Sequence, residues 1–92
     1  MRRDAVRADV REFVLERDGG CVATRIASER QWAIDSCEGR LTLDHVKDQP
    51  MMGRRAPSDP KHLVTICWHH HLDGWATAHR PELREYLKGV NA

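Results

Sequence analysis

The chain has 92 residues, of which 40% are hydrophobic and 5% aromatic, so it is long enough for one domain with a thin core. Its 15 basic and 14 acidic residues give a net charge of +1, which does not by itself indicate a nucleic-acid-binding protein. No stretch approaches the roughly 18 apolar residues of a membrane helix, so we expect no membrane partner. The length predicts one domain over residues 1–92, and the odd count of three cysteines favours the reduced cytoplasm over a disulfide-forming compartment.

The first forty residues are predicted to form one helix and one loop. Val6, Val10, Phe13 and Val14 recur at intervals of three and four, which predicts a helix over residues 4–18. Two glycines follow, and glycine tolerates the left-handed conformation that ends a helix. Residues 19–40 show little periodicity and are predicted to be a loop.

The second half of the chain is predicted to contain two strands and two helices. Residues 41–46 and 63–67 are β-prone runs, separated by a loop rich in Pro, Gly and Arg. A single turn is expected at Pro60, and a helix that Gly74 makes short or irregular is expected from about residue 69. A last helix is predicted over about residues 81–88. This pattern indicates an α+β fold with a core over about residues 41–80.

Three cysteines and one histidine are candidate ligands for a structural zinc ion. Cys67 and His70 stand three residues apart, a spacing at which a tight turn can bring two ligands to one tetrahedral zinc. Cys21 and Cys37 stand at the two ends of the predicted loop and would complete the set. Three cysteines fit a disulfide framework poorly, and a small chain gains stability from a bound metal. The alternative is three ordinary buried cysteines, which are common in protein cores.

A second group of candidate ligands begins with two adjacent residues, Asp44 and His45. Together they offer a hard oxygen ligand and an imidazole that titrates near neutral pH. Sixteen residues separate His45 from His62, and His71 stands at the start of the next predicted helix. Successive residues of a helix are rotated by about 100°. His70 and His71 are therefore expected to point to different sides, so that each can serve a different metal ion.

The positions of Asp44, His45, His62 and His71 resemble those of the HNH nuclease family, whose core is a β-hairpin and a helix that hold one divalent metal ion. The similarity covers residues 41 to about 80, and the flanking sequence is most similar to small HNH proteins of actinobacterial phages. This chain has His62 where the family usually has Asn, and so keeps a polar, hydrogen-bonding side chain there. The resemblance implies a zinc-stabilised ββα-metal domain with a helix at each end, which acts beside phage terminase or other packaging proteins.

The resemblance also implies a role for each residue in the hydrolysis of DNA phosphodiester bonds. His45 would be the general base, a task that suits an imidazole that is neutral near pH 7. Asp44 and His71 would hold a catalytic divalent ion (Mg²⁺, Mn²⁺, Ni²⁺ or Zn²⁺), and His62 would orient the loop that carries His45. Since neighbouring strand residues point to opposite faces, the strand is expected to end or bulge at Asp44 and His45. The candidate contacts to DNA phosphates are Arg54, Arg55, His79 and Arg80.

A function of a different class shares many of these features. A zinc-stabilised DNA- or protein-binding module without catalysis would have the same fold and the same cysteines. The presence of Asp44, His45 and His71 together favours the nuclease, whereas His62 in place of Asn favours the binding module. Arg54 and Arg55 would be solvated loop charges if they do not contact phosphates.

Overall fold

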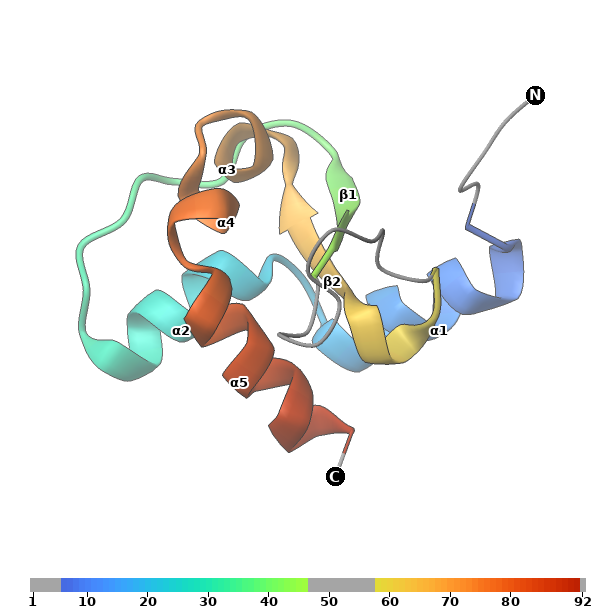
Figure 1. The fold of residues 1–92 in the computed structure, drawn as a ribbon. Coiled ribbons are helices and arrows are strands. Elements are labelled where there is room, and N and C mark those ends of the chain that lie inside the picture. The colour runs from blue at the N-terminus through green and yellow to red at the C-terminus, as the bar shows by residue number, and fades with distance from the viewer. Residues whose placement is uncertain (1–5, 47–57, 92) are drawn as a thin grey trace.

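The computed structural model describes residues 6–46 and 58–91 of the chain, which form a small α+β structure (Figure 1). No helix in these two ranges is long and apolar enough to cross a membrane. The order of the elements along the chain is α1 (Ala8–Asp18), α2 (Val22–Arg30), β1 (Leu41–His45), the 3₁₀-helix η2 (Pro60–His62), β2 (Leu63–Cys67), α3 (Trp68–Leu72), α4 (Trp75–Ala78) and α5 (Arg80–Val90).

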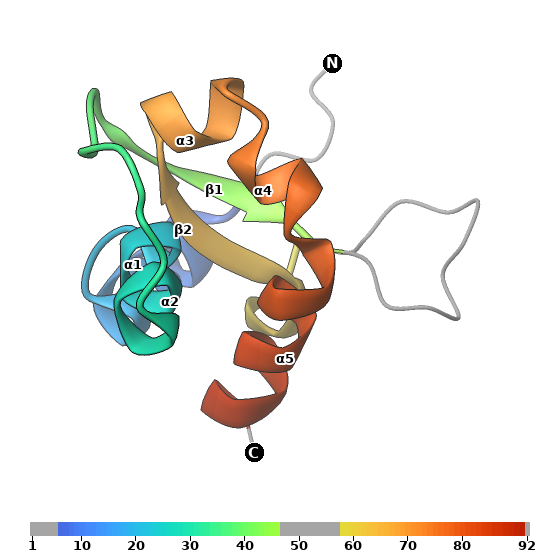
Figure 2. The same cartoon turned by 90° about the vertical axis from the view of Figure 1, so that its left-hand side faces the viewer.

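The two strands pair antiparallel, with Leu41 opposite Cys67 and His45 opposite Leu63. All five residues of β2 are buried, whereas β1 is partly exposed. A two-stranded sheet is not stable in water alone, and here helices α1 and α2 pack on β2 (Figure 2). The second strand has the predicted bounds, and the first ends one residue earlier than predicted, at His45.

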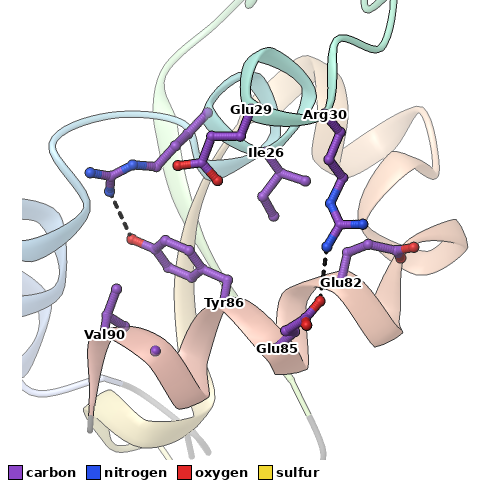
Figure 3. A pocket seen from close by; sticks show the side chains of 9 residues that line it. Ile26, Glu29, Arg30, Glu82, Glu85, Tyr86 and Val90 are labelled. Atoms are coloured by element: carbon purple, nitrogen blue, oxygen red, sulfur yellow. Dashed lines mark hydrogen bonds and ion pairs between the residues drawn. The ribbon is translucent and has the colours of Figure 1, made fainter.

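The apolar core lies between β2, α2 and α5. Val64 and Ile66 of β2 belong to the same buried cluster as Leu83 and Leu87 of α5. In Figure 3, Arg30 of α2 reaches across a surface hollow of about 340 Å³ to an acidic residue of α5. The helices are therefore joined by apolar contacts below and by polar contacts at the surface.

Helix α1 differs from its prediction in its start and in its contacts. The prediction placed the start at residue 4, but Val6 and Arg7 are not helical and α1 begins at Ala8. The predicted apolar stripe is also wrong at Phe13, which is 52% exposed. Instead the end of the helix is held by Arg17, which donates hydrogen bonds to two main-chain carbonyls of η2 and β2, at 2.7 and 2.6 Å.

The predicted loop over residues 19–40 is wrong, because α2 occupies its first half. This helix buries Val22, Ala23, Ile26 and Ala27, a narrow stripe at helical spacing in which two of the four residues are alanine. Small side chains give a weak periodic signal, and the surrounding polar residues obscured it. Residues 31–40 have no helix or strand, as predicted for this part.

Of the three C-terminal helices, α3 and α4 are short and α5 is longer than predicted. Gly74 adopts a left-handed conformation (φ 93°) and separates α3 from α4, so the expected irregular helix is two short ones. The last helix was predicted over residues 81–88, but α5 extends from Arg80 to Val90 and passes through Gly89. Glycine lowers helix stability without preventing a helix, and the buried leucines hold α5 in place.

Candidate metal centres

Four side chains from separate parts of the chain meet at one end of the core. Cys21 directly precedes α2, Cys37 lies between α2 and β1, Cys67 ends β2, and His70 lies on α3. The ligand atoms of these residues all lie within 4.8 Å of one another. The predicted ligand set therefore comes together in a cluster that could hold a metal ion such as zinc.

The distances within this cysteine cluster suit tetrahedral coordination. The Nδ1 atom of His70 lies 3.1 Å from the sulfur of Cys67, 3.8 Å from that of Cys21 and 3.9 Å from that of Cys37. Ligands at the usual zinc–nitrogen and zinc–sulfur bond lengths stand about 3.5 Å apart across a tetrahedron. The Nε2 atom of His70 is buried and has no hydrogen-bond partner among the described residues. Nδ1 is thus the nitrogen that His70 presents to a metal ion.

The protein environment acts differently on two of the thiols. Partial desolvation of the Cys37 sulfur, followed by the sulfurs of Cys67 and Cys21, raises the pKa of this thiol to about 12, although the residue as a whole is exposed. Burial alone would also raise the pKa of Cys67, but backbone hydrogen bonds from His70 and Glu38 outweigh it and lower that pKa. A main-chain N–H also points at Cys21, whose sulfur accepts from Cys67 at 3.3 Å. Such N–H donors stabilise the thiolates that bind a metal.

The second candidate centre joins Asp44 of β1 to His71 of α3. The Asp44 side chain is almost buried, and its Oδ1 atom lies 3.5 Å from Nε2 of His71. Arg80 donates from Nη1 to the other oxygen, Oδ2, at 2.6 Å. The same Nη1 donates to the main-chain carbonyl of His45 at 3.2 Å. Arg80 therefore fixes the carboxylate so that only Oδ1 faces the histidine.

A hydrogen bond from Thr42 decides which nitrogen of His71 carries a proton. The Thr42 hydroxyl donates its single hydrogen to the carbonyl of Ile66 at 2.7 Å, and its oxygen lies 2.8 Å from His71 Nδ1. Since the hydroxyl hydrogen is already used, Nδ1–H must be the donor in this second bond. The Nε2 atom of a neutral His71 then presents a lone pair to the carboxylate oxygen of Asp44. Two acceptors that face each other in this way require a cation or a proton between them.

The other two predicted catalytic histidines, His45 and His62, make side-chain contacts with Ser58 and Asp59. His45 Nε2 is 2.9 Å from the hydroxyl of Ser58, and His45 is the last residue of β1. His62 is buried, and its Nδ1 atom lies 2.9 Å from a carboxylate oxygen of Asp59. Its main-chain carbonyl accepts a hydrogen bond from Val46 at 2.8 Å and so ties η2 to the end of β1.

Within the described residues, no third metal-ligating side chain comes within 4.8 Å of both Asp44 and His71. Protein-family models, curated proteins and solved structures give no match to this chain.

Of the four residues predicted to contact DNA, the structure describes His79 and Arg80. Arg54 and Arg55 lie outside the described residues. The ring of His79 packs against Trp32 and Trp75, at centroid distances of 5.0 and 4.4 Å. Arg80 was predicted to contact phosphate, but its Nη1 atom binds Asp44, because a buried carboxylate requires a positive partner.

Two features of the second centre were missing from the sequence-based prediction, namely the contribution of Thr42 and the pairing of Arg80 with Asp44. Thr42 stands two residues before Asp44, and alternate residues of a strand point to the same face, so this partner could have been found from the sequence. The pairing of Arg80 with Asp44 could not be predicted from the sequence, because the two lie 36 positions apart and several other carboxylates were equally plausible partners.

Proposed function

We propose that the chain is a metal-dependent endonuclease of the HNH type, which hydrolyses DNA phosphodiester bonds and is stabilised by a structural zinc ion. The observation that carries the proposal is the separation of 3.5 Å between two potential metal ligands, Asp44 Oδ1 and His71 Nε2. Ligands at about 2.1 Å from one ion, in adjacent coordination positions, have a separation of this order. Two protein ligands leave several positions of a divalent ion open to water and to a phosphate oxygen.

The zinc part of the proposal rests on the donor set. Three thiolates and one imidazole are typical of structural zinc sites, which are closed by four protein ligands. Because the cysteine cluster is part of the core, a metal ion there would join α2, β2 and α3. The ligand set of Asp44 and His71 contains oxygen and nitrogen only, so the two centres would take ions for different purposes.

Each residue of the second centre would have its own task in the reaction. A bound divalent ion supplies positive charge for the phosphate oxygens as negative charge develops on them. Asp44 and His71 hold that charge in place, while Arg80 and Thr42 keep both ligands oriented. Ser58 binds Nε2 of His45, which leaves Nδ1 of that ring to accept a proton from the attacking water. The strand–strand–helix order of β1, β2 and α3 is consistent with the ββα arrangement of the HNH family.

The first test of this function is cleavage of supercoiled plasmid by the purified protein with Mg²⁺, Mn²⁺, Ni²⁺ or Zn²⁺. The parent protein should nick the plasmid, and a chelator should stop it. His45→Ala should lower the rate by about 10²–10⁴-fold, which is the usual contribution of a general base. Fold, zinc content and DNA affinity should remain near those of the parent, since the base acts on water.

Two further variants separate loss of metal from loss of the base. Asp44→Ala and His71→Ala should also lose activity, but excess divalent ion should partly restore it, and should not restore His45→Ala. Asp9→Ala replaces an exposed aspartate of α1 and serves as the matched control. Nicking by His45→Ala at the parental rate would exclude this base.

A specific contact favours the alternative function, a zinc-stabilised binding module without catalysis. Arg80 already balances the charge of Asp44 at 2.6 Å, so the carboxylate has a partner without a metal ion. If the parent protein cuts nothing with any of the four ions yet binds DNA or a protein, this second function replaces the first.

A further inference from the structure

A third group of potential ligands lies on the surface beside the cysteine cluster. Asp35, His69 and Asp73 each bring a ligand atom within 4.8 Å of the other two. The Nε2 atom of His69 lies 3.3 Å from Oδ2 of Asp35. Both aspartates are exposed and His69 is partly exposed. The group shares no residue with the cysteine cluster or with the centre at Asp44 and His71.

The backbone brings these three side chains together in two ways. His69 is the second residue of α3 and Asp73 is its C-cap, four residues later, where the main-chain N–H of Asp73 donates to the carbonyl of His69 at 2.9 Å. Residues with this spacing project from the same face of a helix. Asp35 comes from the segment between α2 and β1, which is tied to α3 by a hydrogen bond from His69 N–H to the carbonyl of Glu38, at 3.0 Å. The position of Asp35 beside His69 and Asp73 therefore depends on the contact between this segment and α3.

The chemistry of the group differs from that of a plain acidic cluster. One imidazole and two carboxylates can bind a divalent transition ion, whereas three carboxylates alone would favour ions such as Ca²⁺ or Mg²⁺. His69 and Asp73 also line a surface hollow of about 480 Å³, which leaves room for water to complete the coordination.

We propose that Asp35, His69 and Asp73 form an exchangeable surface site for a divalent transition ion such as Zn²⁺, Ni²⁺ or Co²⁺. An ion there would join the segment that carries Cys37 to helix α3, and so would support the cysteine cluster from outside. The net charge of the cysteine cluster also permits a second ion next to it. Three thiolates exceed the charge of one Zn²⁺ by one negative charge, so a loaded cysteine cluster would attract a second cation.

The proposal is tested with the full chain, loaded with zinc in the cysteine cluster, in an Asp44→Asn background that removes the proposed catalytic ion site. Titration with NiCl₂ in a calorimeter should show one additional ion per chain. Asp35→Asn and His69→Gln should each weaken nickel affinity by at least about tenfold, since even the loss of an outer partner of a metal ligand typically has this effect. Zinc content measured after the titration should be unchanged, which shows that nickel has not displaced it.

The matched control is Glu38→Gln, which removes one negative charge from the same surface hollow without removing a ligand. Nickel affinity should then change by less than about threefold, the part due to charge alone. The proposal would be overturned if Asp35→Asn and His69→Gln bound nickel as tightly as the Asp44→Asn protein that carries neither change, because the ion would then lie elsewhere. A titration that does not saturate below about 1 mM nickel, corresponding to roughly 4 kcal/mol of binding, would also overturn it, because an ordinary acidic surface binds that weakly.

Discussion

Asp18 is a charged side chain that three elements share. It ends α1 and is almost fully buried. Its Oδ1 atom accepts from the hydroxyl of Tyr86 on α5 at 2.6 Å, and its Oδ2 atom accepts from the main-chain N–H of Thr65 on β2 at 2.8 Å. Arg17 completes the set with a bond of 2.8 Å to Oδ1. A buried carboxylate is costly unless it is paired, so these donors convert that cost into a specific connection between α1, β2 and α5.

Tyr86→Phe should therefore lower the free energy of unfolding at pH 7 by about 1.5–3 kcal/mol, the usual range for a hydrogen bond to a charged group. Burial, followed by Asp18, raises the pKa of Tyr86 from its usual value of 10 to about 12. The folded state then holds the tyrosine proton more tightly than the unfolded state. This stability is fully present below pH 10 and is lost as the pH rises from about 10 through 12. Urea unfolding of the parent and of Tyr86→Phe, at pH 7 and at pH 9.5–11, measures the effect. The difference in their free energies of unfolding should shrink at alkaline pH.

The four residues of the cysteine cluster could be named from the sequence, because three cysteines and one well-spaced histidine leave few combinations. The partners of Asp18 could not. A carboxylate at the end of a helix is usually solvated, and nothing local in the chain indicates that Tyr86, 68 residues away, donates to it. The role of a residue could thus be predicted where few residues have the required chemistry. It could not be predicted where long-range packing alone selects the partner.

At the scale of elements, the segment between α2 and β1 is held by close contact as well as by hydrogen bonds. The main-chain N–H of Trp68 donates to the carbonyl of Arg40 at 2.8 Å. Gly39 next to it has φ 80°, and a Cβ atom at that position would lie 2.7 Å from Cβ of Trp68. The segment therefore approaches α3 as closely as only a glycine allows.

Gly39→Ala should lower the free energy of unfolding by about 1–3 kcal/mol, from the left-handed conformation and the contact with Trp68 together. Gly89→Ala is the matched control, because a Cβ at Gly89 in α5 meets nothing within 4 Å. There the same chemical change should raise the free energy of unfolding by about 0.5–1 kcal/mol, as alanine favours a helix over glycine. Urea unfolding checks both values, and equal signs in the two variants would contradict the close approach.

The elements themselves were predicted unevenly, for physical reasons. Strand β2 and the turn η2 were found because an apolar, β-branched run follows an Asp-Pro pair that favours a turn. Helix α5 was found from Leu83, Tyr86 and Leu87, which are large and lie on one face. Helix α2 was missed because alanines form half of its buried stripe, and their burial is decided by the neighbouring elements.

At the scale of the whole molecule, the core contains few large side chains. The largest fully buried residues are aliphatic or polar, and His70 of the cysteine cluster is among them. Cys21 and Cys67 belong to the same core cluster. A domain of this size is stable by only about 5–15 kcal/mol, whereas a structural zinc site contributes about 10–16 kcal/mol of apparent binding free energy at neutral pH. A zinc ion would therefore decide whether the chain folds.

Purified protein should accordingly contain about one tightly held zinc ion per chain, and its removal by a chelator should largely unfold the protein. Cys37→Ser is the most informative variant, because Cys37 is exposed and its replacement leaves no cavity in the core. It should weaken zinc binding and lower the melting temperature while zinc is present. Zinc content and circular dichroism, measured across a thermal scan, give both quantities.

The chelator also provides the control. If the effect of Cys37→Ser acts through the metal, parent and variant should have the same stability once zinc is removed. Acid should reproduce the loss, since the thiol of Cys37, with a pKa of about 12 without metal, must release its proton to bind zinc, and protons compete better as the pH falls. A zinc-free parent protein with an unchanged melting curve would show instead that the aliphatic core suffices, and that the three cysteines are ordinary core residues.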